Sequence, residues 1–141
     1  MYQLKIFSYL PNPRVWKSLI AGNICGVEVE VIGDKPANLG NWLWDFNPQK
    51  LDKDELGSDH KFARVGKRGF SGVLYKTDSF LKAHPFGTVP AAFSPEGELG
   101  IFESNSILRA VARVGKESNL YGEGPYEASR IDSFLDANLV F

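Results

Sequence analysis

The first third of the chain alternates apolar and polar positions in a way that predicts a strand, a helix and a second strand. Leu4–Leu10 is apolar enough for a central strand of a sheet. Asn12 is a good helix N-cap, Pro13 fits the first helical position, and Gly26 suits the residue after the helix. Val27–Val31 then alternates valine with glutamate, which predicts a strand with one solvated face. This order predicts a right-handed βαβ unit with parallel strands.

The predicted helix carries an apolar stripe. Five residues fall on one helical face, as is typical of a helix packed on a core. They are Val15, Trp16, Leu19, Ile20 and Ile24.

The pattern of the second half predicts a hairpin and a helix. Ala91–Ser94 and Leu99–Phe102 flank Pro95–Glu98, a turn signal between two strands. Apolar residues of Ile107–Val114 then form a helical stripe that ends at Gly115. Together the two halves predict an α/β fold with the βαβ–ββα order of thioredoxin-like domains.

A last helix is predicted from about Pro125, because four apolar residues fall on one side of it: Ala128, Ile131, Phe134 and Leu135. We therefore divide the chain into a thioredoxin-like domain, residues 1–116, and the start of a helical region, residues 125–141.

A long insertion, about residues 34–79, separates the two halves of the first domain. Its segment Asn41–Phe46 holds three large aromatic residues, which predict a short helix on the sheet or a docking patch. The acidic Asp52–Asp59 precedes His60–Phe70, where basic residues and phenylalanines are interleaved. Such a pattern can bind single-stranded RNA, but the nearby acids favour a solvated loop instead.

Residues 88–104 carry the candidate chemistry. Pro90, at the head of a predicted strand, has no N–H for the sheet. If the Val89–Pro90 bond is cis, the chain reverses and leaves the main chain of Val89 free to pair with an extended ligand. Ser104 begins a helix, where free amides favour a carboxylate, and Glu103 can take an ammonium group. These groups suit an α-amino acid or a γ-glutamyl peptide, although a strand entry and a helix cap explain them separately.

Composition limits the classes of function. The 141 residues, 43% hydrophobic and 23% charged, fit one globular domain with a core. A net charge of −1 gives no overall attraction to nucleic acid or to an anionic membrane, so direct nucleic-acid binding is not favoured. There is no apolar run near the ~20 residues of a membrane span and no signal-peptide pattern, so we expect a cytoplasmic protein without a membrane anchor.

The cysteine and histidine counts exclude further classes. Cys25 stands alone, so the chain has no internal disulfide and no Cys-x-x-Cys redox pair. With only His60 and His84 beside it, a zinc site lacks ligands, and we expect no metal. Cys25 ends an apolar helix face, which favours a buried, unreactive thiol.

Two stretches, Phe80–Pro90 and Ile101–Ile107, resemble the N-terminal domain of glutathione transferases. In that family the residue before a cis-proline pairs with the cysteinyl backbone of glutathione, and an acidic residue followed by serine holds the γ-glutamyl end. The resemblance therefore implies that Val89 and Pro90, with Glu103 and Ser104, bind glutathione as substrate or ligand. It also implies that the last helix begins an all-helical second domain, truncated or absent here.

Within that family, the sequence of these motifs is most similar to that of the gamma subunit of eukaryotic translation elongation factor 1B. The segment Asn12–Ala21 is similar to the first helix of that subunit, whereas Thr88 and Ala83-His84 depart from its usual residues. The resemblance implies a scaffold that docks nucleotide-exchange subunits or aminoacyl-tRNA synthetases. It also implies a homodimer formed through the helices at 104–114 and 125–141.

A catalytic function is the alternative. Glutathione transfer needs a hydroxyl that lowers the pKa of the cysteine thiol. By resemblance to tyrosine-type transferases, Tyr9 at the end of the first strand is the candidate, and Arg14 can add positive potential. Pro13, which has no donor, excludes the serine mechanism. Tyr9 as a core aromatic and Arg14 as a surface charge explain these residues equally well. The scaffold is favoured over a weak transferase that conjugates glutathione to electrophiles, because Phe102–Asn105 and Asn12–Ala21 match the elongation-factor subunit more closely.

Overall fold

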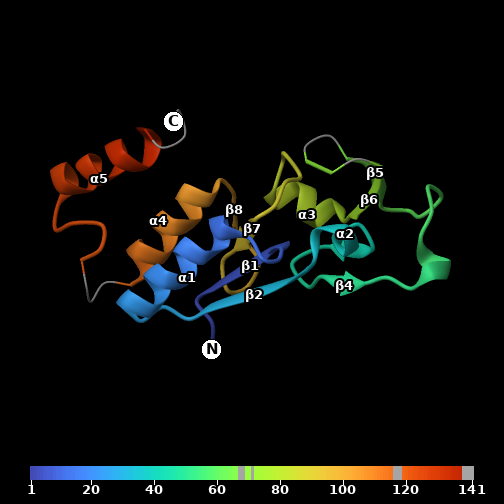
Figure 1. The fold of residues 1–141 in the computed structure, drawn as a ribbon, viewed down its shortest axis with the longest axis horizontal. Coiled ribbons are helices and arrows are strands. Elements are labelled where there is room, and N and C mark those ends of the chain that lie inside the picture. The colour runs from blue at the N-terminus through green and yellow to red at the C-terminus, as the bar shows by residue number, and fades with distance from the viewer. Residues whose placement is uncertain (67–68, 71, 116–118, 138–141) are drawn as a thin grey trace.

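The computed structural model describes residues 1–66, 69–70, 72–115 and 119–137 (Figure 1). The predicted βαβ unit is confirmed: β1 (Leu4–Tyr9) and β2 (Val29–Asp34) are parallel neighbours joined by α1 (Pro13–Cys25). The Asn12 side chain accepts a hydrogen bond from the Arg14 N–H at 3.0 Å, as an N-cap should. Local signals at both ends of the helix therefore set its bounds.

The predicted hairpin and the helix after it are also confirmed. β7 (Ala91–Phe93) runs antiparallel to β1 and to β8 (Gly100–Ile101), which gives a sheet in the order β2-β1-β7-β8. The turn between them needs Gly97, whose φ is 82°. α4 (Ser104–Val114) follows and lies beside α1 (Figure 1). This is the thioredoxin-like βαβ–ββα arrangement.

The insertion folds into a sheet of its own. Its strands are β3 (Trp42–Trp44), β4 (Gln49–Lys50), β5 (Ala63–Val65) and β6 (Val73–Lys76), in the order β4-β3-β6-β5. Its helical parts are α2 (Pro36–Leu39) and the 3-10 turn η1 (Lys53–Glu55), and α3 (Asp78–Ala83) begins where the insertion ends. A short helix or docking patch at Asn41–Phe46 was the wrong prediction, because Trp42–Trp44 instead pairs with β6 and its last residue is buried.

Two cores lie on opposite faces of the first sheet. Leu4 and Ile6 of β1 face the core beneath α1 and α4, whereas Phe7 faces a second core shared with the insertion. In that second core the ring of Trp44, 1% exposed, lies 5.6 Å from Phe7 and 5.9 Å from Phe80. The insertion is therefore packed onto the domain by aromatic contacts.

The apolar stripe predicted for α1 is only partly buried. Trp16, Ile20 and Ile24 are 50–59% exposed, so the prediction was wrong for three of its five residues. The face of α1 that does pack on the sheet is built from small residues, with Ser18, Ala21, Gly22 and Cys25 beside Val15. Small residues let the helix approach closely: a Cβ at Gly22 would lie 2.7 Å from the carbonyl oxygen of Val27.

Helix α5 (Pro125–Ala137) begins where the sequence predicted it and lies against α4. The Arg109 guanidinium pairs with Asp132 at 2.8 Å and also with Asp136, and the Asn105 amide donates to the Leu135 carbonyl at 2.7 Å. Residues 138–141 lie outside the described part of the chain. The division into residues 1–116 and 125–141 stays a prediction. No helix among the described residues is long and apolar enough to span a membrane.

Candidate functional site

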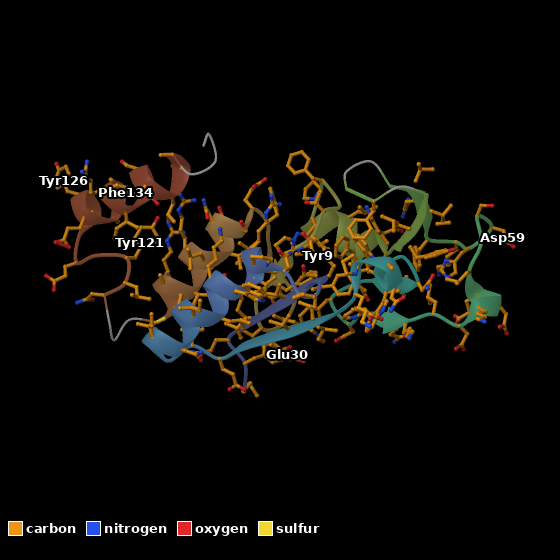
Figure 2. The ribbon with its side chains drawn as sticks, viewed as in Figure 1. Tyr9, Glu30, Asp59, Tyr121, Tyr126 and Phe134 are labelled. Atoms are coloured by element: carbon orange, nitrogen blue, oxygen red, sulfur yellow. The ribbon has the colours of Figure 1, made fainter. Side chains whose placement is uncertain are left out.

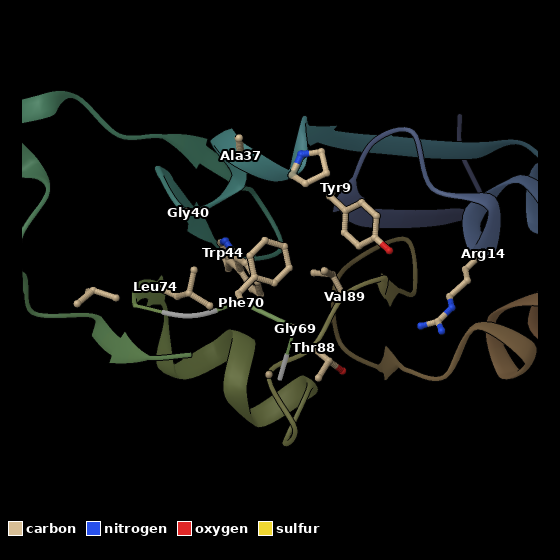
Figure 3. A pocket seen from close by; sticks show the side chains of 13 residues that line it. Tyr9, Arg14, Ala37, Gly40, Trp44, Gly69, Phe70, Leu74, Thr88 and Val89 are labelled. Atoms are coloured by element: carbon tan, nitrogen blue, oxygen red, sulfur yellow. The ribbon is translucent and has the colours of Figure 1, made fainter. Parts of the chain in front are cut away.

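A cleft lies between the first sheet and the insertion. Its volume is about 730 Å³, within the usual range for small-molecule sites. Tyr9, Arg14 and Val89 line it from the first domain, and Trp44 and Phe70 line it from the insertion (Figure 3). Three of the six residues predicted for the site are therefore brought together in one cavity.

The turn before β7 has the geometry on which the prediction depended, because the Val89–Pro90 bond is cis. Among the residues that the structure describes, no hydrogen bond engages the main-chain N–H or C=O of Val89. Val89 is half-buried and borders the cleft, whereas Pro90 is buried behind it. A ligand in the cleft can therefore reach the main chain of Val89.

Tyr9 lies where the two sheets meet, at the end of β1 (Figure 2). Its hydroxyl is on the Arg14 side of the cleft in Figure 3, and Arg14 is exposed in the first turn of α1. Ser8, the neighbouring hydroxyl, is buried and accepts a hydrogen bond from the Asn12 amide at 3.0 Å. Of the two hydroxyl groups at this strand end, that of Tyr9 is therefore the one that borders the cleft.

Glu103 and Ser104 lie at the start of α4 rather than in the lining of the cleft. Glu103 is exposed, and its side chain makes no capping hydrogen bond. Its φ of 70° is unusual for a residue with a side chain and costs roughly 1–3 kcal/mol, a strain that often marks ligand sites. The carboxylate and the first amides of α4 are therefore presented together.

Lys76 is a buried residue behind the cleft lining that the sequence reasoning missed. It is 7% exposed, donates to the Gly87 carbonyl at 2.8 Å, and lies 5.0 Å from the Trp44 ring centroid. Burial, and then the nearby Arg64, lower the pKa of Lys76. No carboxylate of the described residues pairs with it. A lysine that ends an apolar strand is the one sequence signal that could have found this cation beside the Thr88–Val89 turn.

Comparisons with known proteins agree with this architecture. No family model matches the chain. Elongation factor 1-gamma 2 of Oryza sativa subsp. japonica is 40% identical over 125 residues, which are 89% of this chain and 21% of that protein. Probable elongation factor 1-gamma 1 of Arabidopsis thaliana is 42% identical over 65 residues, 46% of this chain and 15% of its own. The chain thus spans about a fifth or less of the length of these relatives.

Comparison with solved structures identifies the fold. A Bombyx mori glutathione transferase superposes with a TM-score of 0.57 at 16% identity, covering 99% of this chain and 49% of its own. A theta-class enzyme of Xanthomonas axonopodis pv. citri, with glutathione bound, gives 0.53 at 21% identity and covers 96% and 48%. The chain has the glutathione-transferase fold. Its resemblance to elongation factor 1-gamma, predicted from the motifs, is confirmed as well.

Within this glutathione-transferase fold, the basic and aromatic stretch of the insertion is part of the structure rather than a solvated loop. The guanidinium of Arg64 in β5 pairs with the carboxylate of Asp78 at the start of α3 at 2.7 Å. Phe70 packs between Tyr9 and Trp44, with ring centroids 6.2 and 5.6 Å away. Residues 67 and 68 lie outside the described residues. Phe70 is therefore a cleft residue that the sequence did not predict.

His84, a departure from the family motif, serves the core. It is 1% exposed, its Nε2 lies 3.0 Å from the Ala92 carbonyl, and its ring meets that of Phe93 edge-on, with the centroids 4.8 Å apart. Burial lowers the pKa of His84 to about 4, against the opposing hydrogen bond of Ala92. Its ring is neutral at pH 7 and joins α3 to β7. Among the described residues, no cluster of His, Cys, Asp or Glu could hold a metal ion.

Proposed function

We propose that this domain is the glutathione-transferase-like module of an elongation factor 1-gamma protein and acts as a scaffold in the cytoplasmic translation elongation complex. The observation that carries the proposal is the 40% identity with a rice elongation factor 1-gamma over 89% of the chain. The relatives' names place them in translation, and the motif resemblance points to nucleotide-exchange subunits or aminoacyl-tRNA synthetases as partners.

Affinity purification tests the scaffold. The tagged protein, expressed in its own source cells, is expected to retain nucleotide-exchange subunits of the elongation complex through washing at 0.15 M salt, about physiological ionic strength. Recovery of the tagged chain without any translation factor would contradict the proposal.

A homodimer is part of the same proposal. Tyr126 and Phe134 of α5 are 90% and 63% exposed, which supports an apolar contact of this helix with a second copy. Sedimentation equilibrium is expected to give twice the 15.7 kDa chain mass, and Phe134→Asp is expected to shift it toward the monomer. A monomer at 50 µM, about the upper range of weak dimers, would contradict the dimer.

The cleft is proposed to hold glutathione. Val89 offers main-chain groups for its cysteinyl unit, and Glu103 with the N-terminal amides of α4 suits the ammonium and carboxylate of its γ-glutamyl end. The Lys76 ammonium does not itself line the cleft, but it donates a hydrogen bond to the carbonyl of Gly87, a lining residue that precedes the Thr88–Val89 turn, and so supports that turn. Retention on glutathione-agarose, weakened in Lys76→Met, is the expected result.

A weak transferase is the second candidate, and the position of Tyr9 on the cleft favours it. Glutathione S-transferase 1 of Zea mays is 29% identical over 93 residues, 66% of this chain and 41% of its own. Turnover of a dinitrobenzene electrophile should fall about 100-fold in Tyr9→Phe, because the phenol then no longer stabilises the thiolate. Tyr126→Phe, at the far end of the molecule, is the matched control (Figure 2). If the wild type shows no turnover, the transferase candidate is wrong and the scaffold remains as the proposed function.

A further inference from the structure

A second cavity, of about 340 Å³, lies next to the cleft and shares only Leu74 and Gly87 with its lining. Strands β5 and β6 contribute one part of its wall, and α3 with the loop that follows it contributes the other. Most of the lining side chains are apolar: Val65, Leu74, Leu81, Pro85 and Phe86. An apolar cavity of about 150 Å³ already holds a molecule as large as benzene. This cavity therefore has room for a small apolar compound.

Lys76 is the buried polar side chain of this second cavity. Its amine can donate three hydrogen bonds, but among the described residues the structure gives it one acceptor, the Gly87 carbonyl at 2.8 Å. No carboxylate of the described residues pairs with it. The amine lies directly against the turn, because a Cβ at Gly87 would be 2.7 Å from the Lys76 Nζ. Lys76 thus has little contact with solvent and no described counter-charge.

Arg64 places a second cation beside this amine. Its Nε donates to the main-chain carbonyl of Lys76 at 3.4 Å, and its side chain lines the same cavity. Burial, and then the charge of Arg64, lower the pKa of Lys76, which raises the fraction of the amine that is neutral near pH 7. A lysine that is desolvated in an apolar pocket, or that lies next to another cation, becomes a nucleophile. Lys76 meets both conditions.

We propose that Lys76 is a covalent binding site for apolar aldehydes, which it captures as an imine inside this cavity. The lone pair of the neutral amine forms a bond to the carbonyl carbon, and the carbonyl oxygen takes the two amine protons and leaves as water. A C=N bond thus replaces the C=O bond, and no oxidant or reductant is needed. The apolar walls hold the hydrocarbon part of the aldehyde. The site is independent of glutathione binding, because neither Lys76 nor Arg64 lines the cleft.

Reductive labelling of the wild-type chain with benzaldehyde tests the site without any variant. Sodium cyanoborohydride reduces each imine to a stable benzylamine, and mass spectrometry of the peptides then gives a labelling rate for each lysine near neutral pH. Lys76 should be labelled at least about fivefold faster than the exposed Lys82, because its cavity concentrates the aldehyde and more of its amine is neutral. Glyceraldehyde, a polar aldehyde, should not show this advantage. In the urea-unfolded chain the two lysines should react at equal rates.

Two matched variants test the role of the neighbouring cation. Arg64→Gln and Asp78→Asn both break the ion pair between these residues, but only the first removes the positive charge beside Lys76. Arg64→Gln should slow the labelling of Lys76 about threefold or more, whereas Asp78→Asn should not slow it. Three results would overturn the inference: labelling of Lys76 no faster than that of Lys82, the same advantage with glyceraldehyde, or equal slowing by both variants.

Discussion

The first sheet and the sheet of the insertion are specified by the sequence in different ways. β1 and α1 have long apolar patterns and clear caps, so their local sequence predicts them. The strands of the insertion have two to four residues, and β3 finds its partner 32 residues away, with Leu43 opposite Tyr75. Such pairing is decided by burial of aromatic rings rather than by local pattern. The comparison shows that the insertion is specified by its contact with the first domain.

The largest expected effect comes from removing the aromatic anchor of the insertion. Trp44→Ala should lower the free energy of unfolding by about 3–5 kcal/mol, because the deleted ring leaves a cavity among Phe7, Phe70 and Phe80. Trp16→Ala, which removes a half-exposed ring from α1, should cost about 1 kcal/mol or less. Urea unfolding followed by circular dichroism measures both. Equal costs would show that the insertion does not share the core of the first domain.

The stability of the fold should also depend on pH through His84, which joins α3 to β7 beside the insertion. The pKa of His84 is about 4 in the folded protein, below its ordinary value of 6.5, so between these pH values the unfolded chain binds a proton that the folded chain does not. Stability should therefore fall as pH drops from 7 to 4, by up to about 3 kcal/mol from this residue. The stability difference between wild type and His84→Asn should shrink over that window. A difference that is constant from pH 7 to 4 would contradict the buried neutral ring.

A smaller effect is expected in the first region, at the cap of α1. Asn12→Ala should cost about 1–2 kcal/mol, because it removes the cap of the Arg14 N–H and the hydrogen bond to buried Ser8. Asn23→Ala, at an exposed position inside the same helix, should change stability by less than about 0.7 kcal/mol and in the stabilising direction. Urea midpoints that rank the two variants the other way would contradict the capping role.

The same contrast explains how much of the site the sequence could predict. The motif between Phe80 and Ser104 predicted the cis turn, the strand pair and the α4 start, because each has a local signature. Phe70 could not be predicted and Lys76 had only a weak signal, a lysine at the end of an apolar strand, because both residues acquire their contacts only when β6 and the insertion pack on the first sheet. Similarly, Trp16, Ile20 and Ile24 follow a helical stripe that the sequence cannot assign to the core or to the surface.

One spectrum tests the central claim, that the cleft between the two regions binds a thiol tripeptide. In a titration of the 15N-labelled protein with reduced glutathione, the amides of Val89 and Ser104 should shift together. Shifts confined to α5 and the exposed face of α1, or no shift at Val89 with millimolar ligand, would contradict the account.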